Sequence, residues 1–186
     1  MSAYQIGVIV GSLRLESINR KLADALIKLA PSELSFKDIA IDKLPLYNQD
    51  DDNNQAASVK AMKAAIRACD GLLFVTPEYN RSLPGVLKNA LDHGSRPYGQ
   101  SAWAGKPAGI VGASLGAMGS ALAQQHLRNI LSCLNVPVMC QPEVYVHVDQ
   151  DFFEESGDID ANRRDFFKTW MQAFTQWIEQ HAVEKA

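Results

Sequence analysis

Two hydrophobic periodicities alternate along the chain. Short apolar runs rich in β-branched residues, each ended by a turn residue, predict buried strands, whereas apolar residues spaced three and four apart predict helices. Strands are expected at 6–10, 34–41, 71–76 and 108–113, with a fifth inside 136–146. Helices are expected from Ile18 up to Pro31 and at 58–69, 84–94, 118–134 and 163–183.

This alternation of strands and helices predicts a parallel sheet covered on both faces. Five strands favour the order 2-1-3-4-5 of a flavodoxin-like three-layer sandwich over the six-stranded dinucleotide-binding order. Ligands of such sheets bind beyond the carboxyl ends of the strands. The loops 11–19, 76–84 and 114–119 are therefore expected to form the site. The length of 186 residues suits one domain, 1–186.

Composition narrows the classes of partner. Hydrophobic residues make up 47% of the chain and the formal net charge is -3, which argues against a nucleic-acid partner. The sequence contains neither a signal peptide pattern nor an apolar run long enough for a membrane span, so we expect a cytoplasmic protein without membrane insertion. Cys69, Cys133 and Cys140 stand in apolar stretches without a CxxC pair, so reduced, buried thiols are expected. The histidines show no metal-binding spacing.

The loop 11–19 predicts an anion site. Gly11 allows a sharp turn at the strand end, and the loop leads into a helix N-terminus, whose free N–H groups and dipole favour an anion. Arg14 adds a guanidinium suited to phosphate oxygens. Further side-chain donors are Ser12, Ser17 and Asn19. A plain turn followed by a capped helix is the open alternative. Neither GxxxxGK[ST] nor GxGxxG is present, which disfavours an NTPase and an ordinary Rossmann dehydrogenase.

The other two loops indicate a flat ligand. Pro77 and Pro84 stiffen the second loop, whose backbone groups can then bind the edge of a heterocycle. Tyr79 offers a ring to cover that heterocycle, and Asn80 offers both a donor and an acceptor. The third loop is small and glycine-rich, which allows close backbone approach but is a weak signal alone. A phosphate site beside a site for a planar heterocycle suggests FMN.

Two motifs connect these loops to a known family. GSLRxxSxN at 11–19 and TPEYNxSxPGxLKNAxD at 76–92 resemble the NADPH-dependent FMN reductase family, within its bacterial branch of chromate and quinone reductases. Gly-Lys-Pro at 105–107 and His-Leu-Arg at 126–128 are also similar to that branch. The resemblance extends from Gln5 to the C-terminal helix.

The resemblance implies roles for individual residues. It implies that the FMN phosphate is held by Ser12, Arg14, Ser17 and Asn19, and Ile18 is expected as a further cofactor-binding residue. It implies that the isoalloxazine and ribityl side is lined by Pro77, Glu78, Tyr79 and Asn80, with Ser114 and Gly116 as further contacts. Arg81 and His93 are expected on the substrate rim, at positions where relatives differ, so they bear on acceptor preference.

The resemblance also implies an activity. Electrons from NADPH or NADH would pass through N5 of FMN to quinones, and adventitiously to chromate, azo dyes or ferric complexes, in a ping-pong cycle. The flavin carries this chemistry, so no catalytic acid or base is expected. Homodimers or homotetramers are implied, although Leu122 and Gln125 do not supply the charged tetramer contact of some relatives.

Two alternatives remain open. One is a flavodoxin-like electron carrier that docks with a partner protein, which the modest net charge and Arg14 disfavour. The other is a scaffold that has lost FMN, which the intact loops disfavour.

Overall fold

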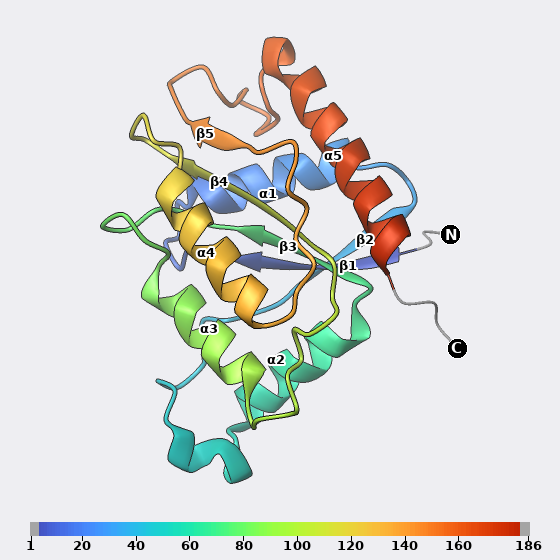
Figure 1. Ribbon diagram of the computed structural model, residues 1–186. Helices are drawn as coiled ribbons and strands as arrows, with labels where there is room; N and C mark the ends of the chain where they lie inside the picture. Colours follow the sequence, from blue (N-terminus) through green and yellow to red (C-terminus); the bar gives the residue numbers. More distant parts are fainter. Residues whose placement is uncertain (1–3, 183–186) are drawn as a thin grey trace.

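Five parallel strands form one sheet in the order β2–β1–β3–β4–β5 in the computed structural model, which describes residues 4–182 (Figure 1). The strands are β1 (Tyr4–Val10), β2 (Leu34–Asp38), β3 (Gly71–Val75), β4 (Ala108–Ser114) and β5 (Tyr145–His147). The α-helices are α1 (Ile18–Leu29), α2 (Ala57–Ala68), α3 (Gly85–Ser95), α4 (Ala121–Cys133) and α5 (Ala161–His181). A short 3-10 helix, η1 (Gln49–Asn54), precedes α2. The predicted flavodoxin-like order is confirmed.

Helices cover both faces of the sheet because alternate strand residues point to opposite sides. Along β1, Val8 and Val10 pack towards α1 and α5, whereas Ile9 packs towards α2, α3 and α4. Trp170 of α5 is a large buried side chain on the first face, and Trp103 is one on the second. The result is a central sheet with a hydrophobic layer on each side (Figure 1).

Several element boundaries differ from the predicted ones. α4 begins at Ala121 rather than at 118, because Gly119 and Ser120 adopt φ values of 55° and 70°, which no α-helix accommodates. α3 begins at Gly85, so Pro84 is its N-cap rather than its first residue. β2 ends at Asp38, short of the predicted 41. β5 occupies 145–147, so its last residue lies one beyond the predicted range 136–146.

The expectation for the cysteines is wrong at two positions. Cys69 is buried, but Cys133 and Cys140 are exposed. Cys133 is the last residue of α4, and Cys140 lies in the connection to β5. Apolar neighbours in sequence do not bury a side chain that lies on the solvent side of its own element.

No helix within the described part of the chain is both long and apolar enough to cross a bilayer.

Candidate functional site

Three loops meet at the carboxyl edge of the sheet. The first loop (11–19), the second loop (76–84) and the third loop (114–119) follow β1, β3 and β4, which are neighbours in the sheet (Figure 1). Hydrogen bonds join their bases: Gly11 N donates to Val75 O over 2.9 Å, and Thr76 N donates to Val111 O over 3.0 Å. A Cβ at Gly112 would lie 2.0 Å from Thr76 O, so the end of β4 lies directly against the start of the second loop.

The first loop leads into a helix end that is open to an anion. Ser17 is the N-cap of α1, and its Oγ accepts a hydrogen bond from Arg20 N over 3.2 Å. Because the oxygen is the acceptor, the hydroxyl proton can be donated to a ligand. The first turn of α1 contains no acidic residue, so nothing there neutralises the positive end of the helix dipole.

The first loop carries a positive charge without a partner among the described residues, which favours binding of an anion. Within residues 4–182, the exposed Arg14 guanidinium makes no hydrogen bond and no ion pair. The one acid of the loop, Glu16, lies 3.4 Å from Lys21 Nζ and is thereby matched. Ser12 and Ile18 are half-buried beside this charge, and Leu15 is 99% exposed. The loop therefore presents an unmatched cation and free donors on one side of the α1 N-terminus.

The side chain of Asn19 is not free to donate a hydrogen bond to a phosphate. Its side chain is buried, with Nδ2 donating to Ala113 O and Oδ1 accepting from Ala113 N, both over 2.9 Å. Both polar atoms of the amide are thus committed to the backbone of β4. The correction is that Asn19 fixes the start of α1 against the strand that carries the third loop.

The second loop contains a tight, strained turn. Tyr79 and Ser82 exchange two backbone hydrogen bonds of 2.9 and 3.0 Å, and Asn80 and Arg81 have φ values of 50° and 65°. These features define a type I′ turn, which glycine and asparagine favour and arginine does not. The left-handed conformation at Arg81 costs about 1 kcal/mol. The turn presents the Tyr79 side chain with half of its surface exposed.

The side chain of Glu78 is directed to the start of α4. Its Oε2 accepts hydrogen bonds from the backbone N–H groups of Leu122 and Ala123, at the start of α4. Its Oε1 lies 3.4 Å from Arg81 Nη1. Ser82 Oγ is also hydrogen-bonded to α4, through His126 Nδ1 at 2.9 Å. Sequence reasoning did not find these ties, because no local pattern indicates that an acid in one loop caps a helix that follows another.

The third loop is exposed and held at its ends. Ser114 Oγ donates to Gly116 O over 2.8 Å, and the side chains of Leu115, Ala117 and Met118 face solvent. At the far end, a Cβ on Gly119 would lie 2.6 Å from the Tyr145 carbonyl carbon. The loop is thus anchored on β5 while its middle remains accessible.

His93 does not lie on the substrate rim. It follows Gly85 by eight residues along α3, roughly 12 Å from the edge where that helix begins. The ring is buried, with Nε2 2.8 Å from Pro45 O and an edge-to-face contact with Tyr47. The correction is that His93 packs α3 against the segment after β2. Arg81, in contrast, is two-thirds exposed beside Tyr79, as a rim residue should be.

Polar side chains around Lys63 and Tyr47 form a cluster next to His93. Lys63 is buried, and its ammonium contacts Arg96 O and Gln55 Oε1. Burial lowers the pKa of Lys63, and the Arg67 charge lowers it further. Burial, together with the Asp52 charge, raises the pKa of Tyr47. These groups fasten the connection between β2 and α2 to α3, away from the three loops.

A hollow of about 540 Å³ lies beside the second loop, between α3 and α4. Its lining is Ser82, Leu83, Gly85, Lys88, His126, Asn129 and Ile130. Among the described residues, no three His, Cys, Asp or Glu side chains converge to hold a metal ion.

The residues at the three loops fit FMN. A phosphate monoester needs hydrogen-bond donors and positive charge, which Arg14, Ser17 and the open α1 N-terminus supply together. A flat ring needs an apolar or aromatic surface and a rigid backbone edge, which Tyr79 and its type I′ turn supply. Both sets lie at the edge of one sheet.

Comparison with known proteins gives the same result. The family model for NADPH-dependent FMN reductase matches residues 4–151. The 2-hydroxy-1,4-benzoquinone reductase of a Burkholderia species is 48% identical over 182 residues, which cover 97% of this chain and 100% of that protein. A quinone reductase of Escherichia coli strain K12 is 39% identical over 180 residues, covering 94% of this chain and 95% of that protein.

A solved structure is also closely similar. FerB, described as a flavoenzyme NAD(P)H:(acceptor) oxidoreductase from Paracoccus denitrificans, superposes with a TM-score of 0.92 at 41% identity, covering 97% of this chain and 100% of that one. Most of the chain lies inside the match to the family model, and both motifs that predicted the family lie inside it as well. The chain therefore belongs to the NADPH-dependent FMN reductase family.

Proposed function

We propose that this protein is an FMN-containing, NAD(P)H-dependent oxidoreductase that reduces quinones, with chromate, azo dyes and ferric complexes as adventitious acceptors. The observation that carries the proposal is that an open α1 N-terminus, the exposed Arg14 and the exposed Tyr79 lie at one sheet edge, and Arg14 has no partner among the described residues. The quinone substrate is supported by the relatives at 48% and 39% identity that are named quinone reductases.

Each loop has its own part in holding FMN. The first loop binds the phosphate through the α1 N-terminus, Arg14 and the hydroxyl of Ser17. Ser12 also lies on the phosphate side. The further cofactor contacts are Ile18, Pro77, Tyr79, Asn80, Ser114 and Gly116. When bound, FMN would supply the hydride-transfer chemistry between the nicotinamide and the acceptor.

The chain itself contributes binding and orientation. The type I′ turn fixes Tyr79 and Asn80, so the ring position is set before the flavin binds. The exposed middle of the third loop leaves one side accessible, where nicotinamide and acceptor bind in turn. Arg81 stands at the rim with a guanidinium that attracts anionic co-substrates. No side chain is assigned as a catalytic acid or base, since water can supply the protons.

The proposal includes assembly and location. We expect a homodimer or homotetramer in the cytoplasm. Size-exclusion chromatography with light scattering measures the first, and fractionation of cells measures the second.

A spectroscopic experiment tests the function. The purified protein should be yellow with a flavin spectrum, should bleach rapidly when NADPH or NADH is added without oxygen, and should regain its colour rapidly with benzoquinone. A bound flavin that neither nicotinamide bleaches would instead identify an electron carrier reduced by a partner protein. A colourless protein that takes up no added FMN would contradict both.

A further inference from the structure

Helix α4 begins without a cap of its own. Its N-cap residue, Ser120, has a positive φ of 70° and makes no capping hydrogen bond with its side chain. The Ser120 hydroxyl is buried and accepts instead from Gln124 Nε2 over 3.0 Å. The first turn of α4 contains no acidic residue. The first N–H groups of this helix must therefore find an acceptor elsewhere.

Glu78 supplies that acceptor from the second loop. Its Oε2 lies 3.0 Å from Leu122 N and 3.3 Å from Ala123 N, although 44 and 45 residues separate them in sequence. The Glu78 side chain is 9% exposed. A carboxylate in this position satisfies two N–H donors and neutralises the positive end of the helix dipole.

The same loop is tied to α4 a second time. Ser82, at the end of the type I′ turn, is hydrogen-bonded to His126, one helical turn beyond Leu122. The turn carrying Tyr79 and Asn80 is thus held at both ends by the first two turns of α4. Since the turn includes two non-glycine residues at positive φ, an outside support of this kind stabilises a shape that the loop alone would not favour.

We infer that Glu78 is a positioning residue of the flavin site. This inference rests on the proposed function. Glu78 holds the second loop on α4 so that Tyr79 and Asn80 meet the ring. The Glu78 carboxylate also occupies the N-terminus of α4. The N-terminus of α1 is therefore the one that binds the phosphate.

The test compares Glu78→Ala with Glu78→Gln. Titration of the flavin-free chain with FMN gives Kd, and hydrogen exchange at Leu122 and Ala123 reports the cap without any flavin. We expect Glu78→Ala to raise Kd about tenfold and to speed exchange at both amides, because a charged capping acceptor is lost. Glu78→Gln retains one acceptor oxygen, so its Kd should stay within about threefold of wild type.

Glu143→Ala is the matched control. Glu143 lies beside α4, where its Oε1 is 3.8 Å from Arg128 Nε and accepts from Gln125 Nε2 over 3.4 Å. Within residues 4–182 its side chain makes no hydrogen bond to the three loops. Its removal should leave both the Kd for FMN and the two exchange rates unchanged.

Two results would overturn the inference. One is a wild-type Kd in Glu78→Ala. The other is a raised Kd with unchanged exchange at Leu122 and Ala123, which would make Glu78 a direct ligand. Glu78→Gln alone still tests the inference if Glu78→Ala does not fold. A Kd for FMN about ten times that of Glu143→Ala, with unchanged exchange at Leu122 and Ala123, would then overturn the inference. A wild-type chain that binds no FMN contradicts the proposed function instead, while the exchange measurement still tests the cap.

Discussion

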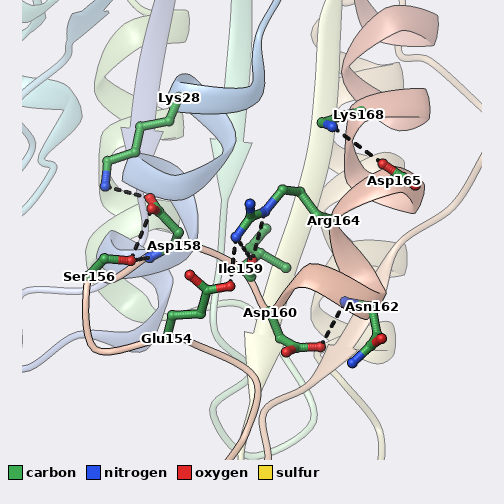
Figure 2. Close-up of polar contacts among 10 residues, drawn as sticks. All are labelled: Lys28, Glu154, Ser156, Asp158, Ile159, Asp160, Asn162, Arg164, Asp165 and Lys168. Atoms are coloured by element: carbon green, nitrogen blue, oxygen red, sulfur yellow. Dashed lines mark hydrogen bonds and ion pairs between the residues drawn. The ribbon is translucent and has the colours of Figure 1, made fainter.

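The first loop and the segment 149–165 both lead from the carboxyl end of a strand into a helix, but they satisfy their charges in opposite ways. Figure 2 shows the second of these segments, where Lys28 Nζ binds Asp158 over 2.6 Å and Arg164 binds Glu154 over 2.7 Å. Asp160 caps α5 by accepting from Asn162 N. In the first loop, Arg14 makes no such contact with any residue in the described range 4–182. Ion pairs within the segment 149–165 and to Lys28 of α1 hold it in place, whereas the first loop carries a cation for which residues 4–182 offer no partner.

The largest effect is expected at Asn19, because both polar atoms of its side chain are hydrogen-bonded to β4. Asn19→Ala removes two buried hydrogen bonds and leaves the Ala113 N–H and C=O without them. We expect a loss of about 2–4 kcal/mol in the free energy of unfolding, measured by urea denaturation of the flavin-free chain. The exposed Asn129→Ala should change it by less than about 0.5 kcal/mol. Equal losses in the two variants would show that the buried contacts contribute nothing special.

Arg14 tests the ligand-binding half of the comparison. Arg14→Ala should raise the Kd for FMN by about 10- to 100-fold, since a charge-assisted hydrogen bond contributes about 1.5–3 kcal/mol. The Tm of the flavin-free protein should not change, because Arg14 has no partner within residues 4–182.

Arg20→Ala is the control for Arg14→Ala, because it removes an arginine that already has an ion-pair partner. Arg20 lies in the first turn of α1, and its Nη1 is 2.6 Å from Asp38 Oδ1. Its replacement should lower the Tm slightly and leave the Kd for FMN within about twofold, since a surface ion pair contributes about 0–1 kcal/mol. A Kd that rises equally in both variants would indicate a general charge effect rather than a phosphate contact.

Arg81 is intermediate, being exposed but loosely paired with Glu78. Arg81→Ala should raise the KM for the nicotinamide about threefold with little change in FMN content, because an exposed cation attracts the anionic co-substrate through water. The effect should shrink as salt is added. Steady-state kinetics at low and high ionic strength measures it, and an unchanged KM at low salt would refute this role.

The smallest effect is expected at Asp158, which lies in the ion-paired segment 149–165. The hydrogen bond from Lys28 and, after it, that from Ser156 lower the pKa of Asp158 (Figure 2). A lowered folded-state pKa gives stability that is present above the ordinary aspartate pKa of about 3.9 and is lost as pH falls through the folded value. Asp158→Asn should therefore lower the Tm slightly at neutral pH, and the difference should vanish in acid. A difference that persists in strong acid would show that the charge is not its cause.

Prediction from sequence succeeded where the signal was local. The apolar runs of β1, β3 and β4 located the sheet, and the residues of 11–19 located the open N-terminus of α1. It failed where a side chain bonds to a distant element. Asn19 reaches Ala113 and Glu78 reaches Leu122, and no spacing in the sequence encodes either contact. His93 was misplaced for the same reason, since its burial depends on the segment that carries Pro45.

The close approach at Gly112 determines how this enzyme can be engineered. A side chain there would clash with the Thr76 carbonyl, and one at Gly119 would clash with the backbone of Tyr145. Random mutagenesis of 112–119, which covers the end of β4 and the third loop, would therefore yield many misfolded variants. A library restricted to Leu115, Ala117 and Met118, whose side chains face solvent, would vary the surface presented to acceptors while leaving the two fixed glycines intact.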